Sequence, residues 1–313
     1  MEIRRSLKTR SLDVVRRIFT EPPFEQFLYS LAGGTRYLGM LSRTIPNPYL
    51  YKAGSMRNVT RDGFNYALDL SCMMQWVVFW NFKEKQRDRL YSLVNEGDVV
   101  LDVGTNIGEM LLHFARLVGN DGFVYGFEPD ETNFANAQKN ISLNDFQNIH
   151  VFNFGVSDKK ETQKLYRVDE HNLGMNRILN DAEAARFEDF TVIETDTLDN
   201  IVVRNRIQKV DLIKIDIEGY EMHALRGART VLETFKPKLF IEVGYARLLN
   251  LGTSPNELIS YLNKFGYKVF HAETEEVITE NYDFAPLGEG GIDVYALAEN
   301  TSSTMMADKK TKP

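Results

Sequence analysis

From about residue 98 onward, apolar strand-like segments alternate with amphipathic helical segments, and this alternation constrains the fold more than any other feature. Residues 99–103 (VVLDV) form a nearly continuous apolar run, as expected for a strand that helices cover on both faces of a sheet. Further strands are expected at 123–127, 149–154, 210–216, 239–243, 267–271 and 292–298. Strands joined by helices build a mostly parallel, doubly wound sheet with right-handed crossovers, so the predicted fold class is α/β.

The chain divides into three predicted parts. These are an N-terminal helical extension (1–56), one large domain (57–299) with a hairpin and a helix (57–96) before a Rossmann-like core (97–299), and a disordered tail (300–313). The Asp62-Gly63 pair is a type I′ turn signal for the hairpin. The tail is polar and rich in lysine, a composition that does not support a packed core.

Composition limits the classes of function. The formal net charge is -7, which argues against a protein that binds the phosphates of a nucleic acid. No nucleic-acid partner is therefore predicted. The longest apolar runs fall far short of the ~20 residues that span a bilayer, so no transmembrane segment is expected. Cys72 is the single cysteine, which excludes an intramolecular disulfide and fits a reducing compartment. We therefore expect a cytoplasmic protein.

The N-terminal stretch around residues 11–19 is amphipathic and basic, with apolar residues at helical spacing and arginines opposite them. Such a helix could make peripheral contact with an anionic membrane surface. We favour the alternative, in which the helix packs on the large domain, because basic amphipathic patterns are unspecific. The sequence carries no signal of the oligomeric state.

The turn after the first predicted strand (DVGTNIG, 102–108) is the first place to look for a ligand, since ligands of open α/β sheets bind outside the carboxyl ends of strands. Gly104 and Gly108 allow the backbone to turn sharply and to approach a ligand closely. The helix that follows favours a carboxylate at its N-terminus. Asp102, at the tip of the strand, is placed to meet a cation.

Glu128 ends the second predicted strand and can accept both hydroxyls of a ribose. The preceding turn reads G-T-N-I-G and lacks the third spaced glycine of the G-x-G-x-x-G pattern that binds a pyrophosphate. The pattern therefore favours a nucleoside cofactor without phosphates over NAD(P), and an oxidoreductase is the weaker alternative.

The chain resembles the FkbM-type class I methyltransferases from about residue 57 to 275. The shared motifs are RDG (61–63), LDL (68–70), GDVVLDVGTNIG (97–108, with alanine more usual at Thr105), GFEP (126–129), Asn140 with Asn144, GVSD (155–158), IKIDIEGYE (213–221), LRGA (225–228) and PKLFIE (237–242). The string at 213–221 is the most distinctive of these, whereas the turn at 104–108 is common to many related enzymes.

The resemblance implies a seven-stranded sheet whose final strand is antiparallel, with S-adenosylmethionine as cofactor. The reaction it implies is O-methylation of a sugar, glycan or natural product. Cofactor contacts are expected from Asp102, Gly104, Thr105, Asn106 and Gly108 at the methionine end, Glu128 and Pro129 at the ribose, and Gly155, Ser157 and Asp158 beside the adenine.

Three acids at the ends of neighbouring strands are the predicted catalytic residues: Asp216, Glu218 and Glu242. Gly219 can bend the chain so that the first two carboxylates face the same site, where one would take the proton from the acceptor hydroxyl. Together the three acids could also hold Mg²⁺. The competing interpretation is that Glu218 caps the next helix and that Glu242 pairs with Lys214 or Arg247.

His171, in the insertion after the third strand, is an alternative base. The acceptor is expected to contact residues 158–190 and the N-terminal region, which carry no recognisable motif. A scaffold that binds the cofactor without turnover is the non-enzymatic alternative, and the acids at the strand ends count against it.

Overall fold

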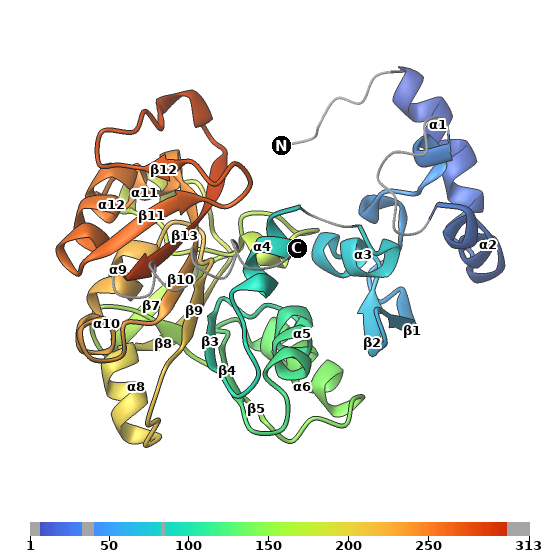
Figure 1. The fold of residues 1–313 in the computed structure, drawn as a ribbon. Coiled ribbons are helices and arrows are strands. Elements are labelled where there is room, and N and C mark those ends of the chain that lie inside the picture. Colours follow the sequence, from blue (N-terminus) through green and yellow to red (C-terminus); the bar gives the residue numbers. More distant parts are fainter. Residues whose placement is uncertain (1–6, 33–40, 83–84, 299–313) are drawn as a thin grey trace. The chain divides into compact units, whose positions relative to one another are not determined.

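A computed structural model of the chain describes residues 7–32, 41–82 and 85–298 (Figure 1). The described residues form two compact units. The first contains residues up to 82 together with 142–144 and 169–174, and the second contains 85–141, 145–168 and 175–298. The predicted tail at 300–313 lies outside the described residues, and the predicted boundary between residues 56 and 57 stays a prediction.

An eight-stranded sheet organises the second unit, in the order β12-β11-β13-β10-β9-β3-β4-β5. The strands are β3 (Val99–Val103), β4 (Phe123–Phe127), β5 (Ile149–Phe152), β9 (Leu212–Ile215), β10 (Lys238–Gly244), β11 (Tyr267–His271), β12 (Val277–Ile278) and β13 (Gly291–Ala298). Strands β5, β4, β3, β9 and β10 run parallel, and β13 runs antiparallel between β10 and β11. The predicted doubly wound α/β fold is confirmed, with the two-residue strand β12 added at one edge.

Helices cover both faces of this sheet because successive strand residues point to opposite sides. Leu101 and Val103 pack with Ile241 in one apolar cluster, whereas Val100 packs with Phe114 in the other. The helices of the unit are α4 (Lys85–Ser92), α5 (Glu109–Val118), α6 (Glu131–Ser142), α7 (Asp181–Ala184), α8 (Leu198–Arg204), α9 (Glu221–Arg226), α10 (Arg229–Phe235), α11 (Tyr245–Asn250) and α12 (Pro255–Lys264). Helices α4 and α5 contribute to the second cluster, and helices α8 to α12 contribute to the first.

The insertion after β5 folds into a separate three-stranded sheet in the order β6-β8-β7. Its strands are β6 (Gly155–Val156), β7 (Glu161–Tyr166) and β8 (Phe190–Asp196), and β7 pairs with β8 in antiparallel register. The two longer strands of the insertion are thus partners of each other.

The first unit contains α1 (Leu7–Ile18), α2 (Pro22–Ala32), two short 3-10 turns (Leu41–Thr44 and Pro48–Leu50), β1 (Met56–Arg61), β2 (Phe64–Asp69) and α3 (Met73–Trp80). Strands β1 and β2 form the predicted hairpin, and both residues of its Asp62-Gly63 turn have positive φ. The single helix predicted after the hairpin is in fact two, since α3 ends at Trp80 and Asn81 takes a left-handed conformation. Within the described ranges, every helix is too short or too polar to cross a bilayer.

Candidate active site

Loops that follow β3, β4, β9 and β10 bring the predicted functional residues to one end of the main sheet. These strands are parallel neighbours, so their carboxyl ends meet at the same edge. The chain leaves β3 towards β4 on one side and reaches β9 and β10 on the other, which makes this the point where strand order reverses. Ligands of open α/β sheets bind at such a point.

The glycine turn after β3 comes very close to the end of β9. Gly104 has a φ of 86°, and a Cβ atom there would lie 1.9 Å from the carbonyl oxygen of Asp216. Only glycine can hold the two backbones this close. Asn106 is also left-handed, with a φ of 52°, and its buried Oδ1 has no hydrogen-bond partner.

A buried lysine joins the two strands at the centre of the site. The Nζ atom of Lys214 donates to the carbonyl oxygen of Gly104 at 3.0 Å. It lies 3.4 Å from Oδ1 of Asp102 and 3.3 Å from Oδ2 of Asp216. Although burial disfavours its charge, the carboxylates of Asp216 and Asp102 hold the pKa of Lys214 above its usual range. Lys214 is therefore a permanent cation.

Asp102 is fully buried beside Lys214. Its Oδ2 accepts a hydrogen bond from Thr105 Oγ1 at 3.1 Å, while Oδ1 has no hydrogen bond. Burial raises the pKa of Asp102, opposed by the charge of Lys214. The sequence predicted a cation at Asp102, and the protein itself provides one. Asp102 Oδ1 faces Lys214, so the buried Oδ1 of Asn106 is the acceptor of this turn that keeps no partner, and it fits a hydrogen-bond donor of a bound ligand.

Glu128 connects the end of β4 to the glycine turn. One of its carboxylate oxygens accepts from the backbone amide of Asn106 at 2.7 Å and the other from that of Asp130 at 3.0 Å. Burial raises the pKa of Glu128 to about 7 despite these two amides. Behind it, Asn153 donates to the carbonyl oxygens of Glu128 and Pro129. Each carboxylate oxygen keeps a second lone pair for a hydroxyl donor.

The turn at Ser157 and Asp158 lies against the start of α9. The Oγ atom of Ser157 is 3.5 Å from the hydroxyl of Tyr220, and Oδ2 of Asp158 is 3.3 Å from Nδ1 of His223. The rings of Tyr220 and His223 stack with centroids 4.2 Å apart. Gly155, in β6, lies near Pro129, whose Cβ would be 3.7 Å from a Cβ at Gly155. These contacts link the two segments predicted to flank the ribose and the adenine.

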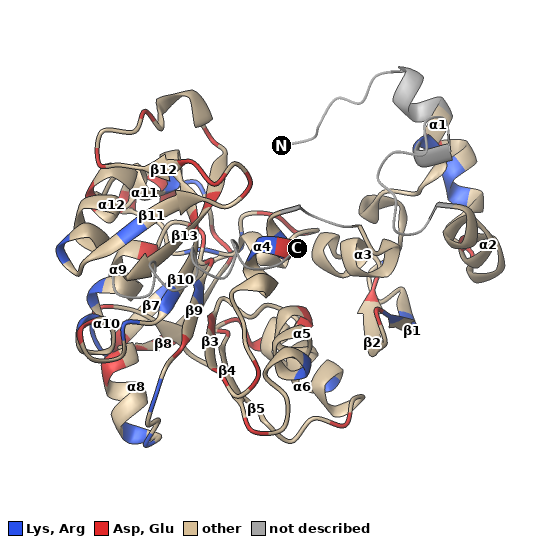
Figure 2. Ribbon diagram, viewed as in Figure 1, with Lys and Arg blue, Asp and Glu red and all other residues tan. Residues whose placement is uncertain are grey.

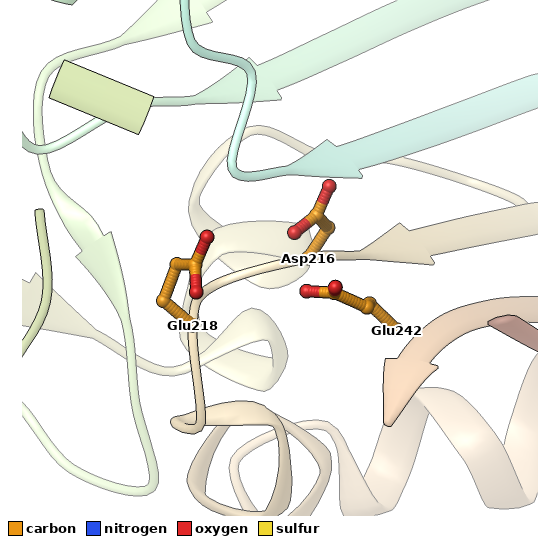
Figure 3. A group of neighbouring side chains, drawn as sticks. All are labelled: Asp216, Glu218 and Glu242. Atoms are coloured by element: carbon orange, nitrogen blue, oxygen red, sulfur yellow. The ribbon is translucent and has the colours of Figure 1, made fainter. Parts of the chain in front are cut away.

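Three carboxylates meet beside Lys214. Figure 3 shows Asp216, Glu218 and Glu242 pointing toward one another, and one oxygen of each lies within 4.8 Å of the others. Asp216 follows β9, and Glu242 projects from β10. Glu218 has a φ of 57°, and Gly219 beside it has a φ of 106°, so the chain bends here as the sequence predicted.

Arg247, in the first turn of α11, holds two of these carboxylates. Its Nη1 donates to Glu218 and its Nη2 donates to Glu242 at 2.8 Å. The pairing of Glu242 with Arg247, one of the alternatives considered from the sequence, is therefore present. The alternative in which Glu218 caps the next helix is wrong, because the N-cap residue of α9 is Tyr220 and no side chain caps this helix. The carboxylate of Glu221 accepts from the amides of Ile217 and Gly219 in the bend before α9. Glu218 therefore does not cap the helix, and its side chain belongs to the cluster of three carboxylates.

The three carboxylates do not carry the same charge. Burial and the neighbouring charge of Asp216 raise the pKa of Glu242 to about 9, so Glu242 is protonated at neutral pH. Burial opposes ionisation of Asp216 as well, but Lys214 outweighs it and holds the pKa of Asp216 below its usual value. A protonated Glu242 can donate a hydrogen bond to an ionised Asp216. Asp216, which Lys214 keeps ionised, is consequently able to accept a proton at pH 7.

Two cations of the site were not predicted as functional residues. Lys214 had a signal, since a lysine inside an apolar strand needs a buried acid beside it. Nothing in the sequence indicated a functional role for Arg247, which was considered only as an alternative partner of Glu242. His171, the alternative base, belongs to the first unit, where its Nδ1 lies 3.2 Å from the carbonyl oxygen of Ser71, and its role stays a prediction.

Comparison with known proteins shows that this chain is similar to methyltransferases. A family model described as "Methyltransferase FkbM domain" matches residues 102–269, which is more than half of the chain. A curated tRNA (guanine(37)-N(1))-methyltransferase from Plasmodium vivax is 30% identical over 151 residues, or 47% of this chain and 16% of that protein. The chain thus spans about a sixth of the length of this curated relative.

Solved structures with a similar fold include two further methyltransferases. Methyltransferase FkbM from Methylobacillus flagellatus is 19% identical with a TM-score of 0.40, and the match covers 71% of this chain and 54% of that one. The chain therefore spans about half of that protein. A putative methyltransferase from Streptococcus mutans, in complex with SAH, is 10% identical with a TM-score of 0.41, and the match covers 69% and 98% of the two chains.

Proposed function

Because this chain belongs to the FkbM methyltransferase family and is an S-adenosylmethionine-dependent methyltransferase, we propose that it methylates a hydroxyl group of a sugar, glycan or natural product. The observation that carries the choice of oxygen is the carboxylate of Asp216, which lies 3.3 Å from Lys214 and is grouped with Glu218 and Glu242. An alcohol is a weak nucleophile, so its attack needs a base within hydrogen-bond reach.

The proposed cofactor site follows the glycine turn and the two segments beyond it. Asp102, Thr105 and Asn106, with the backbone of Gly104 and Gly108, would hold the methionine end. Glu128 would hold the ribose, and Pro129 with the turn from Gly155 through Ser157 to Asp158 would border the adenine. When bound, the cofactor supplies an electrophilic methyl group on a sulfonium centre.

In the proposed mechanism, Asp216 would accept the proton of the acceptor hydroxyl as that oxygen takes the methyl group that the bound cofactor would supply. Lys214 keeps Asp216 ionised and positions it through the contact at 3.3 Å. Arg247 fixes the side chains of Glu218 and Glu242, so the protonated Glu242 is directed at Asp216. Tight positioning of base and hydroxyl provides much of the expected acceleration.

The replacement Glu128→Ala should weaken the binding of S-adenosylhomocysteine about 10- to 100-fold, because hydrogen bonds to a charged acceptor are lost. The loss also releases the amides of Asn106 and Asp130 that shape the pocket. Isothermal titration calorimetry measures the affinity. Glu131→Ala is the matched control, since Glu131 is exposed in the first turn of α6. Equal affinities of the two variants would remove Glu128 from the proposed site.

The three carboxylates also provide the hard oxygen ligands that Mg²⁺ prefers. Arg247 already binds two of them and Lys214 lies 3.3 Å from the third, so the protein itself provides a cation for each of the three carboxylates. We therefore expect dialysis against EDTA to leave methyl transfer at pH 7 within about twofold of its starting rate. A loss of more than about tenfold that added Mg²⁺ restores would instead assign the three acids to a metal.

The acceptor can be sought without assumptions by incubating the protein with methyl-labelled S-adenosylmethionine and fractionated cell extract. Label on the hydroxyl of a glycan or small molecule would support the proposal. Label on RNA would contradict the proposal and make RNA the acceptor. This outcome is included because the Plasmodium vivax relative is named as a tRNA methyltransferase. The net charge of -7 counts against RNA. Cofactor binding without label in any fraction would favour a non-catalytic scaffold.

A further inference from the structure

The two N-terminal helices of the first unit expose an unusual number of large apolar side chains. Sixteen large apolar residues are exposed among the described parts of the chain, and seven of them lie on α1 and α2. These seven, here called the apolar helix face, are Leu12, Val14, Val15, Ile18, Phe24, Phe27 and Leu31. A single exposed apolar residue needs no explanation, whereas a grouped set on consecutive helices marks an interaction surface.

Helix α1 turns its polar side toward its own unit. Asp13 is buried, and it binds Nη1 of Arg16 at 3.0 Å. The Nε of Arg16 donates to the carbonyl oxygen of Arg43 at 2.8 Å. The opposite side of the helix carries Val14, which is 68% exposed, and Ile18, which is 53% exposed and one turn further along. The packing of the unit therefore leaves the apolar side of α1 uncovered.

Helix α2 shows the same arrangement. Its inward side carries Leu28 and the buried carboxylate of Glu25, which binds Nε of Arg57 at 2.8 Å. Phe24 and Phe27 lie three residues apart on another side, where Phe27 is 59% exposed. Polar contacts thus hold both helices to the unit, and both direct apolar side chains outward.

The same segment has a charge opposite to that of the whole chain. Residues 1–17 contain six basic and two acidic residues, whereas the chain as a whole has a net charge of -7. Figure 2 shows basic residues on the described part of α1, and Arg17 is exposed. An apolar face with basic residues on the same helix is the pattern of a helix that lies in the interface of an anionic bilayer.

We propose that the apolar helix face docks on the surface of an anionic lipid bilayer. A lipid surface buries Val14, Ile18 and Phe27 and also neutralises the basic segment. RNA would satisfy only the charge, because phosphates offer no apolar surface. A symmetric dimer through this face would bring two copies of the same basic segment together, which costs energy. The lipid surface is the occupant that matches both features.

Vesicle flotation of the full chain tests the proposal. The protein should float with vesicles of phosphatidylcholine mixed with phosphatidylglycerol and stay unbound with phosphatidylcholine alone. The double replacement Val14→Glu and Ile18→Glu should reduce the bound fraction at least about tenfold, because two buried apolar contacts become charged. Val203→Glu is the matched control, since Val203 is 77% exposed on α8 and should leave flotation unchanged.

Three outcomes would overturn the proposal. In the first, the double variant Val14→Glu with Ile18→Glu floats as well as the parent protein. In the second, the protein binds a labelled RNA oligomer and does not bind vesicles. In the third, the protein forms a concentration-dependent dimer that the same double variant abolishes. Phe27→Glu is a second, independent variant on α2 and should also reduce flotation. Circular dichroism melting of each variant, matched to the parent, shows that lost flotation reflects lost docking and not unfolding.

Discussion

Replacement of Lys214 by methionine should lower the free energy of unfolding by about 3–5 kcal/mol, because the fully buried carboxylate of Asp102 then loses its cation. The lysine is only 4% exposed, and its Nζ contacts the carboxylates of Asp102 and Asp216 and the carbonyl oxygen of Gly104. Methionine has a similar length, so little packing is lost with the charge. Urea denaturation followed by circular dichroism gives the change in stability.

Lys209→Met is the matched control for this experiment. Its Nζ lies 3.0 Å from Asp211, but the lysine side chain is about half exposed, and such surface pairs contribute at most about 1 kcal/mol. A second test is the double variant Lys214→Met with Asp102→Asn, which should be more stable than Lys214→Met alone. A loss below about 1 kcal/mol for Lys214→Met would contradict the assigned role of this cation.

The arrangement of the main sheet was predictable because burial on two faces leaves a simple signature. Residues 99–103 read as a nearly continuous apolar run, and they form a central strand. Local exceptions were not predictable. The break between α3 and α4 depends on Asn81 taking a left-handed conformation, which is one residue inside a helical pattern. Strand β12 has only two residues and exists through its pairing with β11.

The acids of the candidate site were identified from the sequence, and their charge states were not. Asp216 and Glu242 look alike in the chain, since each comes at or near the end of a buried strand. Only the fold places Lys214 against the first and Arg247 against the second. A pKa depends on such neighbours in space, so the choice of base needed the structure.

Asp216→Asn should lower kcat about 10²- to 10⁴-fold, the usual contribution of a positioned general base. Asparagine has nearly the same shape and can still accept a hydrogen bond from Lys214, but it cannot take the hydroxyl proton. The affinity for S-adenosylhomocysteine should stay within about threefold, because the proposed cofactor contacts come from other residues. Single-turnover methyl transfer and calorimetry measure the two quantities separately.

The dependence on pH distinguishes Asp216 from Glu242 as the base. Since Lys214 lowers the pKa of Asp216, this base stays ionised as the pH falls to about 5, and the rate at saturating cofactor should be flat between pH 5 and 8. Glu242 loses its proton near pH 9, and the new negative charge beside Asp216 makes Asp216 a stronger base. The wild-type rate should therefore rise through pH 9.

Glu242→Gln isolates this second titration. Glutamine can still donate a hydrogen bond to Asp216 and accept one from Arg247, so activity at pH 7 should fall by less than about tenfold. The rise near pH 9 should vanish, because the variant has no proton to lose. If Glu242→Gln instead abolished turnover at pH 7 while Asp216→Asn kept it, the roles of the two acids would be exchanged. The hydrogen bond between them makes their titrations interdependent, so the two variants must be compared over the same pH range.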